Sequence, residues 1–134
     1  SSPAIGKYMA NLVADKYGFA ENEDFTYDRK PIPKTSEMSV EEHSELIKKN
    51  KLYGKIICRC ESVTEGEIVD AINRPLGATT VDGIKRRVRA SAGRCQGGFC
   101  LPHLMEILSR ELGEDMSDVV KNSKDSYYVN GRVK

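Results

Sequence analysis

The chain has 134 residues and a formal net charge of +1 at pH 7, so overall charge favours neither a nucleic-acid nor a membrane partner. Hydrophobic residues make up 39% of the sequence and charged residues 31%, which predicts one small domain, with or without appendages, around a modest core. No apolar run is long enough to span a bilayer, and we expect a cytoplasmic protein without a signal peptide.

The first 18 residues have the pattern of a single amphipathic helix. Pro3 suits its first turn, apolar residues recur at helical spacing, and Gly18 is a natural residue for its end. The apolar positions are Ile5, Met9, Leu12 and Val13. Because the chain starts with Ser1 and Ser2 and not with methionine, we expect it to be a piece of a longer protein.

A linker is predicted over residues 21–38, which are charged and contain Pro31 and Pro33. Ser39 and Glu42 then form a capping box, so a helix should begin there and run to about Asn50. A short extended piece, residues 55–57, should follow it.

Three more helices are predicted before residue 114. Thr64 and Glu67 form a second capping box, and Thr79 or Thr80 should cap the next helix. Residues 99–112 carry the strongest helical repeat, which Gly113 should end. The last expected elements are a short helix near residues 117–122 and a β-leaning tail over 126–134 with an Asn130-Gly131 turn.

All four cysteines lie in two close pairs, Cys58 with Cys60 and Cys95 with Cys100. In an extended segment, side chains two residues apart share a side, so Cys58 and Cys60 can face one target while Arg59 points away. The two glycines between Cys95 and Cys100 permit close approach of backbone amides to a bound anion. Cys100 should lie near the N-terminus of a helix, where negative charge is stabilised. We therefore predict that four thiolates converge on one metal site.

Four cysteines suit three chemistries. Zinc takes four thiolates in a closed site, but its usual C-x-x-C spacing differs from the C-x-C and C-x-x-x-x-C spacings here. Two disulfides would be unusual in a cytoplasmic chain. A [2Fe–2S] cluster held by four cysteines is the third, and the spacing favours it over the other two.

Basic residues surround the cysteines: the segment 85–94 contains five of them and no acid. Arg59 and Arg94 adjoin cysteines directly, and they are candidates to compensate the negative charge of four thiolates and a cluster. A solvated helix surface is the alternative, and the lack of interleaved aromatic residues argues against a nucleic-acid partner. His103 follows Cys100 at the spacing of a ligand pair, but with four cysteines present we expect His103 and His43 to be surface residues.

Two segments resemble the bacterioferritin-associated-ferredoxin-like domain: residues 57–68 (ICRCESVTEGEI) and residues 93–100 (GRCQGGFC). The resemblance covers roughly residues 53–113. It implies a small helical fold and one [2Fe–2S] cluster, whose ligands would be Cys58, Cys60, Cys95 and Cys100. Residues 85–90 resemble the version fused to the C-terminus of FAD-dependent glycerol-3-phosphate dehydrogenases, and residues 1–6 resemble the segment that closes the FAD domain of those enzymes.

We thus predict a mainly α protein: a small helical cluster-binding domain whose helices start at the cysteine loops, preceded by a helix and an extended linker. The predicted parts are a terminal helix of a FAD domain outside this chain (1–20), a linker (21–38), the cluster domain (39–113) and a C-terminal tail (114–134).

The predicted function is electron transfer from reduced flavin in the same parent protein to an unidentified acceptor. The chain has no dinucleotide fingerprint and no acid–base centre, so we expect no catalytic residue in it and no dehydrogenase activity from it alone. Residues expected to contact the cluster or tune its potential are Arg59, Arg94, Gln96, Gly97, Gly98 and Phe99. The alternatives are a zinc-binding interaction module with a basic helix, and a cluster with a structural or redox-sensing role.

Overall fold

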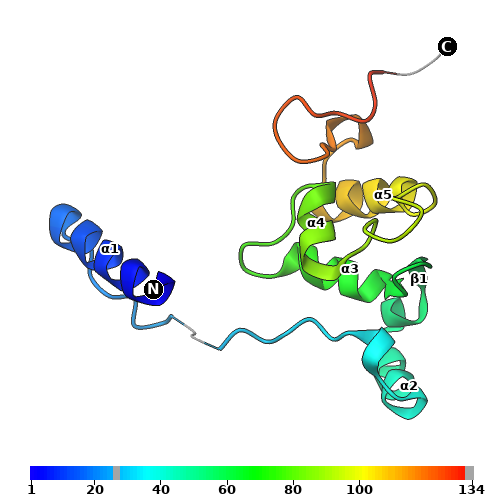
Figure 1. Cartoon of the computed structure of the whole chain (residues 1–134), viewed down its shortest axis with the longest axis horizontal. Coiled ribbons are helices and arrows are strands. Elements are labelled where there is room, and N and C mark those ends of the chain that lie inside the picture. The colour runs from blue at the N-terminus through cyan, green and yellow to red at the C-terminus, as the bar shows by residue number, and fades with distance from the viewer. Residues whose placement is uncertain (26–27, 132–134) are drawn as a thin grey trace. The chain divides into compact units, whose positions relative to one another are not determined.

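The computed structural model describes residues 1–25 and 28–131, and the chain divides into two units, Ser1–Lys30 and Pro31–Lys134. Helices dominate both units, and a two-stranded sheet is the one sheet in the described part of the chain (Figure 1). This confirms the predicted mainly α fold. Within the described residues, no helix combines the length and the apolarity that crossing a membrane requires.

The first unit contains one helix, α1 (Ser2–Tyr17), which ends as predicted at Gly18 in the left-handed conformation. The Gly18 N–H donates to the Ala14 carbonyl, so the last turn is closed. No residue of α1 is buried, and its apolar stripe is exposed at Ile5, Tyr8, Met9, Leu12, Val13 and Tyr17. That this stripe packs against a FAD domain outside the chain stays a prediction.

The second unit is built on three helices that pack against one another: α3 (Glu65–Asn73), α4 (Val81–Val88) and α5 (Leu101–Leu112). Figure 1 shows them together, with β1 (Ile56–Cys58) beside the start of α3. β1 pairs antiparallel with β2 (Val63–Thr64), and α2 (Val40–Lys49) precedes both strands. Fully buried apolar side chains from α3, α4 and α5 form the core, among them Ile68, Ile84, Leu104 and Leu108.

Helix starts follow the predicted caps. Both capping boxes form, at Ser39 and at Thr64. Thr80, rather than Thr79, caps α4 by accepting a hydrogen bond from the Gly83 N–H. α5 starts at residue 101, two residues later than predicted, because residues 94–100 are used in turns.

The C-terminal region contains less regular structure than predicted. The helix expected near residues 117–122 is a 3₁₀ turn, η3 (Met116–Asp118), and the tail forms one isolated bridge between Val120 and Tyr127. Val129 packs against the core. Gly131 has a positive φ of 105°, as a turn requires, but residues 132–134 beyond it lie outside the described residues.

The end of the predicted linker packs against the domain through a buried hydrogen-bond network. Residues 35–37 form a 3₁₀ turn, η1 (Thr35–Glu37), and Thr35 is 7% exposed. The Thr35 hydroxyl donates to the Glu67 carboxylate at 2.9 Å, and the Thr64 backbone N–H and hydroxyl donate to the same carboxylate at 2.8 and 2.7 Å. Glu67 thus ties the linker end to β2 and to the start of α3.

Thr35→Val should weaken this attachment, because a buried carboxylate loses one of its donors. We expect a local loss of about 1.5–3 kcal/mol, the range for hydrogen bonds to charged groups. Hydrogen exchange at the Met38 amide, which donates to the Thr35 carbonyl, should become faster while α5 keeps its protection. Ser36→Ala, at an exposed neighbour, is the control, and equal exchange in both variants would show that the bond contributes nothing.

The prediction that His43 is a surface residue is wrong. Its side chain is half-buried, and its Nε2 atom hydrogen-bonds to the Tyr53 carbonyl at 2.9 Å. The contact joins α2 to the next turn, η2 (Lys51–Gly54), so His43 helps to attach α2 to the domain.

Candidate metal centre

The four cysteines come from two segments that meet where β1 ends and α5 begins. Cys58 is the last residue of β1, and Cys60 lies in the turn that leads to β2. Cys95 lies in the turns between α4 and α5, and Cys100 is the N-cap residue of α5. The Sγ atoms of Cys58 and Cys60 are 3.9 Å apart, and those of Cys60 and Cys95 are 3.6 Å apart. The predicted convergence on one place is present, although a turn, not an extended strand, brings Cys60 beside Cys58.

Exposure divides the four thiols into two groups. Cys58 and Cys100 are each 1% exposed, whereas Cys60 is exposed and Cys95 is half-buried. All four are free thiols, so the structure contains neither of the two disulfides considered from the sequence. A group bound by these thiols would be buried on one side and accessible on the other.

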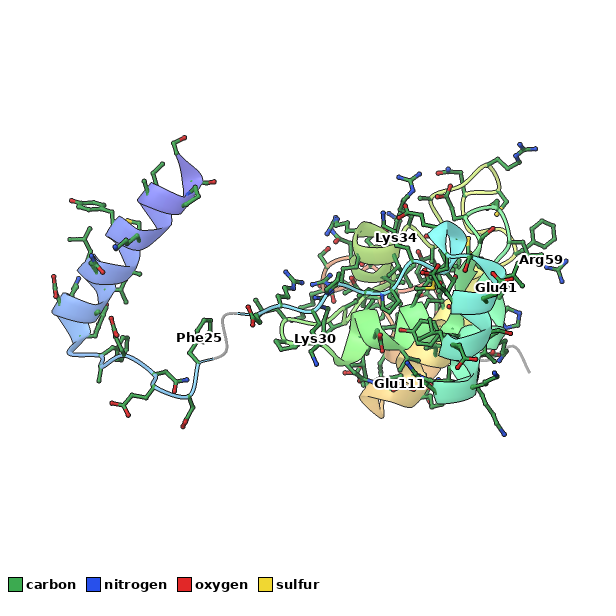
Figure 2. All side chains as sticks on the ribbon, turned by 90° about the horizontal axis from the view of Figure 1, so that it is seen from below. Phe25, Lys30, Lys34, Glu41, Arg59 and Glu111 are labelled. Carbon is green, nitrogen blue, oxygen red and sulfur yellow. The ribbon has the colours of Figure 1, made fainter. Side chains whose placement is uncertain are left out.

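A hollow of about 420 Å³ opens between the cysteines. Besides the four cysteines, its lining consists of Arg59, Arg94 and Phe99. The two arginines are exposed, and Figure 2 shows Arg59 at the edge of the domain with its side chain extending outward. Cationic and aromatic groups therefore border the hollow, and no carboxylate lines it.

Backbone amides of the glycine loop point at Cys95. Hydrogen bonds from the Gly97 N–H, the Cys60 side chain and the Phe99 N–H lower the pKa of the Cys95 thiol, and the Gly98 N–H adds to this. Gly97 has a φ of 91°, which few residues other than glycine adopt, so the loop needs glycine at this position to present its amides. The loop is therefore shaped to stabilise a thiolate at Cys95.

Gln96 differs from its predicted role. Its backbone N–H donates to the Gly93 carbonyl at 2.9 Å, and its side-chain amide donates to the same carbonyl at 2.8 Å. Gln96 therefore closes the turn that carries Cys95. Of the other three predicted amides, those of Gly97 and Phe99 hydrogen-bond to the Cys95 sulfur, whereas the Gly98 N–H donates to the Cys95 carbonyl at 2.9 Å and contributes less to the sulfur.

The pKa of the Cys100 thiol is shifted upward, opposite to that of Cys95. Desolvation, with the nearby Cys58 thiol adding to it, raises the pKa of Cys100 to about 11. The Ser91 backbone N–H hydrogen-bonds to this thiol and acts in the other direction. A thiolate at Cys100 therefore needs a positively charged partner in the hollow, and binding of a metal group must release its proton.

Residues 56–110 match the family model of the BFD-like [2Fe-2S] binding domain. This part of the chain belongs to that family. The four cysteines and the hollow between them lie inside the matched BFD-like domain, as does all of α3, α4 and most of α5.

The relatives that match this chain are longer proteins. The chain is 53% identical over 137 residues to a glycerol 3-phosphate dehydrogenase from Caloramator mitchellensis, covering 100% of this chain and 28% of that protein. It is 29% identical over 100 residues to anaerobic glycerol-3-phosphate dehydrogenase subunit A1 from Haloferax volcanii, covering 75% of this chain and 16% of the subunit. Hydrogen cyanide synthase subunit HcnB from Pseudomonas aeruginosa is 41% identical over 58 residues, which are 43% of this chain and 12% of the subunit. The chain thus spans less than a third of the length of each, and no solved structure gives a significant match.

The donor set of the BFD-like domain fits a [2Fe–2S] cluster. Iron–sulfur clusters of this type are held by four cysteine thiolates, and four thiols converge here around a hollow. In the described part of the chain, no group of three or more His, Cys, Asp or Glu side chains, the four cysteines included, lies close enough together to hold a single metal ion. Amides that donate to Cys95 and arginines at the rim suit the negative charge that such a cluster brings.

Two further contacts join the cysteine segments, and the sequence alone did not reveal them. Arg89 has a positive φ of 63° at the end of α4, and its Nε donates to the Glu61 carboxylate at 2.7 Å. This ion pair links the residue after Cys60 to the segment that leads to Cys95. Gly93 lies against Cys60, where a Cβ atom would come within 2.5 Å of the Sγ atom. The sequence shows that Gly93 lies two residues before Cys95, but it does not show that Gly93 contacts Cys60 in the fold.

Gly93→Ala should therefore impair metal binding more than an ordinary glycine replacement. The added methyl group would also meet the Cys60 Cβ and a Glu61 carboxylate oxygen at 3.0 Å, so Cys60 must move. We expect the iron content after anaerobic reconstitution to fall by about tenfold, as for other groups that orient metal ligands. Gly54→Ala, whose Cβ would meet Ile47 at an ordinary 3.4 Å, is the control. Equal iron in both variants would contradict the close approach at Gly93.

Proposed function

We propose that this chain supplies the one-electron relay of a FAD-dependent dehydrogenase, with Cys58, Cys60, Cys95 and Cys100 as ligands of a [2Fe–2S] cluster. The observation that carries the proposal is the convergence of four free thiols on one hollow inside a BFD-like domain. When bound, such a cluster accepts and releases one electron at a time.

The residues of this chain would hold the cluster and set its environment. Cys58 and Cys100, both buried, exclude water on the inner side, while the loop amides of residues 97–99 stabilise negative charge at Cys95. Arg59 and Arg94 supply positive charge at the open side, where an added electron would otherwise be uncompensated.

The dehydrogenase part of the proposal comes from the relatives. Two of them are described as glycerol 3-phosphate dehydrogenases, and the chain matches less than a third of each. We propose that the parent protein oxidises glycerol 3-phosphate at FAD outside this chain and that the electrons leave through the cluster. The chain alone would then lack dehydrogenase activity, because it would contain neither the flavin nor the substrate site.

Metal and sulfide analysis of anaerobically purified chain tests the proposal. Iron and acid-labile sulfide in about equal amounts, near two of each per chain, are expected for one [2Fe–2S] cluster. Stoichiometric zinc without sulfide would overturn it and support the zinc-binding module instead. Zinc found in aerobically purified protein does not answer the question, so the iron and sulfide must be measured under exclusion of oxygen.

Neutralising either rim arginine should lower the reduction potential of the cluster. Reduction adds a negative charge, and Arg59→Gln or Arg94→Gln removes a nearby cation, so the reduced state loses stabilisation. Because both side chains are exposed and screened, the effect should be below about 1 kcal/mol per electron. Redox titration followed by visible absorbance measures it. Arg86→Gln, on the exposed side of α4 and outside the hollow, is the control, and a raised or unchanged potential in both rim variants would remove this role.

A further inference from the structure

We propose that the open side of the hollow is a docking surface for a redox protein whose electron-transfer edge carries carboxylates. We call this surface the cationic rim and define it as Arg59, Arg94 and Phe99. The inference rests on the proposed function, because it names the kind of partner that would exchange electrons with the cluster.

The exposure of the thiols places electron exchange at this side. Cys58 and Cys100 are sealed by the core, whereas Cys60 and Cys95 reach the surface with 3.6 Å between their Sγ atoms. A partner therefore comes closest to the sulfurs at Cys60 and Cys95. The shortest path for an electron therefore leaves between Cys60 and Cys95, and the rim residues surround that exit.

Phe99 gives the rim an apolar contact point. Its side chain is 82% exposed, although burying a phenylalanine normally stabilises a fold. Its backbone is held in the glycine loop, where its N–H donates to Cys95, so the ring is presented from an ordered segment. Aromatic residues, phenylalanine among them, and arginines are enriched at protein–protein interfaces relative to the rest of the surface.

The charges of the rim select an acidic partner. Neither Arg59 nor Arg94 forms an ion pair within the described residues, whereas some other cations of the domain are paired with carboxylates. Lys55 and Arg110 bind Glu65, and Arg89 binds Glu61. Two unpaired guanidinium groups that flank an exposed aromatic ring match a surface with carboxylates around an apolar centre.

Overall charge predicts the opposite preference, which makes the inference testable. The chain has a formal charge of +1, and a reduced cluster with four thiolates adds about −3, so the chain that donates the electron carries about −2. A weakly negative protein should favour basic partners if only its net charge acted. Preference for an acidic partner would therefore report the local field of the cationic rim, which acts within about 10 Å at moderate salt.

The test uses the chain with its cluster reconstituted and reduced by dithionite, and two forms of one electron acceptor. Native cytochrome c is basic, and fully succinylated cytochrome c presents carboxylates with the same haem. In each reaction one electron passes from the reduced cluster to the ferric haem iron, so the cluster is oxidised and the haem is reduced. Stopped-flow absorbance of the haem measures the second-order rate constant at low and high salt.

We expect the succinylated form to be reduced on the order of tenfold faster than the native form at low salt, with the difference lost at high salt. Arg59→Glu combined with Arg94→Glu should reverse the preference. Phe99→Ala should slow the reaction of the succinylated form about fivefold without changing its salt dependence. Variants are compared at equal cluster content, so a loss of cluster does not count as a loss of docking.

The control makes the same change in net charge elsewhere. Arg86→Glu combined with Lys124→Glu alters two exposed cations outside the hollow and should leave the preference unchanged. Faster reduction of the native form by the unmodified chain, or equal effects of both double variants, would overturn the cationic rim while leaving the relay intact. Failure to assemble any iron–sulfide cluster would instead overturn the proposed function itself.

Discussion

Replacing any one of the four cysteines with serine should reduce the cluster content of the purified chain by about tenfold or more. Removing a ligand should weaken binding at least as much as removing a residue that only orients a ligand, which typically costs about tenfold or more. Each thiolate would supply one quarter of the ligand set, and a serine hydroxyl is a harder and less acidic donor. The buried positions should be affected most. At Cys58 and Cys100, both 1% exposed, the new hydroxyl would also have to be buried away from water, which costs free energy.

Iron and sulfide analysis, with visible absorbance of the cluster, measures this loss. Far-ultraviolet circular dichroism should show reduced helix content, because the N-terminus of α5 begins at a ligand and metal binding is coupled to folding. His103→Ala is the matched control, since this exposed histidine follows Cys100 at ligand spacing and instead contacts Glu106 at 3.3 Å. A serine variant with full cluster content would show that the replaced cysteine is not a ligand.

Local sequence signals predicted the helices well because their ends are encoded within a few residues. The two capping boxes, the cap at Thr80 and the glycines at positions 18 and 113 all act where the sequence placed them. Apolar residues at helical spacing in α5 predicted its buried side, which includes Leu104 and Leu108. The pairing of cysteines at short spacing likewise predicted that the thiols would converge.

The contacts that complete the site are long-range, and periodicity carries no information about them. Thr35 and Glu67 are 32 positions apart, and Arg89 and Glu61 are 28 apart. Arg89 also illustrates a change of role: it was counted with a basic helix surface, yet it ends α4 with a positive φ and pairs with Glu61. Arg87, from the same stretch, donates to the carbonyls of Gly83 and Leu76, so it supports the loop before α4.

The geometry of Gln96 shows a finer limit. From the sequence, all four loop residues between Cys95 and Cys100 were equivalent candidates to face the sulfurs. In the fold, Gln96 donates its N–H to the Gly93 carbonyl and Gly98 donates its N–H to the Cys95 carbonyl. Two of the four amides therefore close turns, while those of Gly97 and Phe99 point at the Cys95 sulfur. Which amide closes a turn depends on backbone torsions, and the positive φ values of Gln96 and Gly97 are properties of the folded loop.

Removing the cluster from the parent protein should separate its two half-reactions. With all four cysteines replaced by serine, the proposed FAD site should still be reduced by glycerol 3-phosphate, because no residue of this chain is expected to contact that substrate. Electron transfer to the physiological acceptor should slow by more than about tenfold, which corresponds to at least ~1.4 kcal/mol in the barrier. Rapid mixing measures both steps: flavin bleaching with substrate, and flavin reoxidation when the acceptor is added.

The pattern of the two rates distinguishes the remaining roles of the cluster. Slow reoxidation with normal flavin reduction is the result expected of a relay. Loss of both steps would show that the cluster domain supports the structure of the flavin site, and Thr35→Val then tests whether loosening the linker end at Glu67 has the same effect with the cysteines intact. Unimpaired transfer to the acceptor would exclude an obligatory relay and leave a structural or redox-sensing cluster. A relay must exchange electrons with a partner at the protein surface, and Cys60 and Cys95 reach that surface, so their exposure favours the relay.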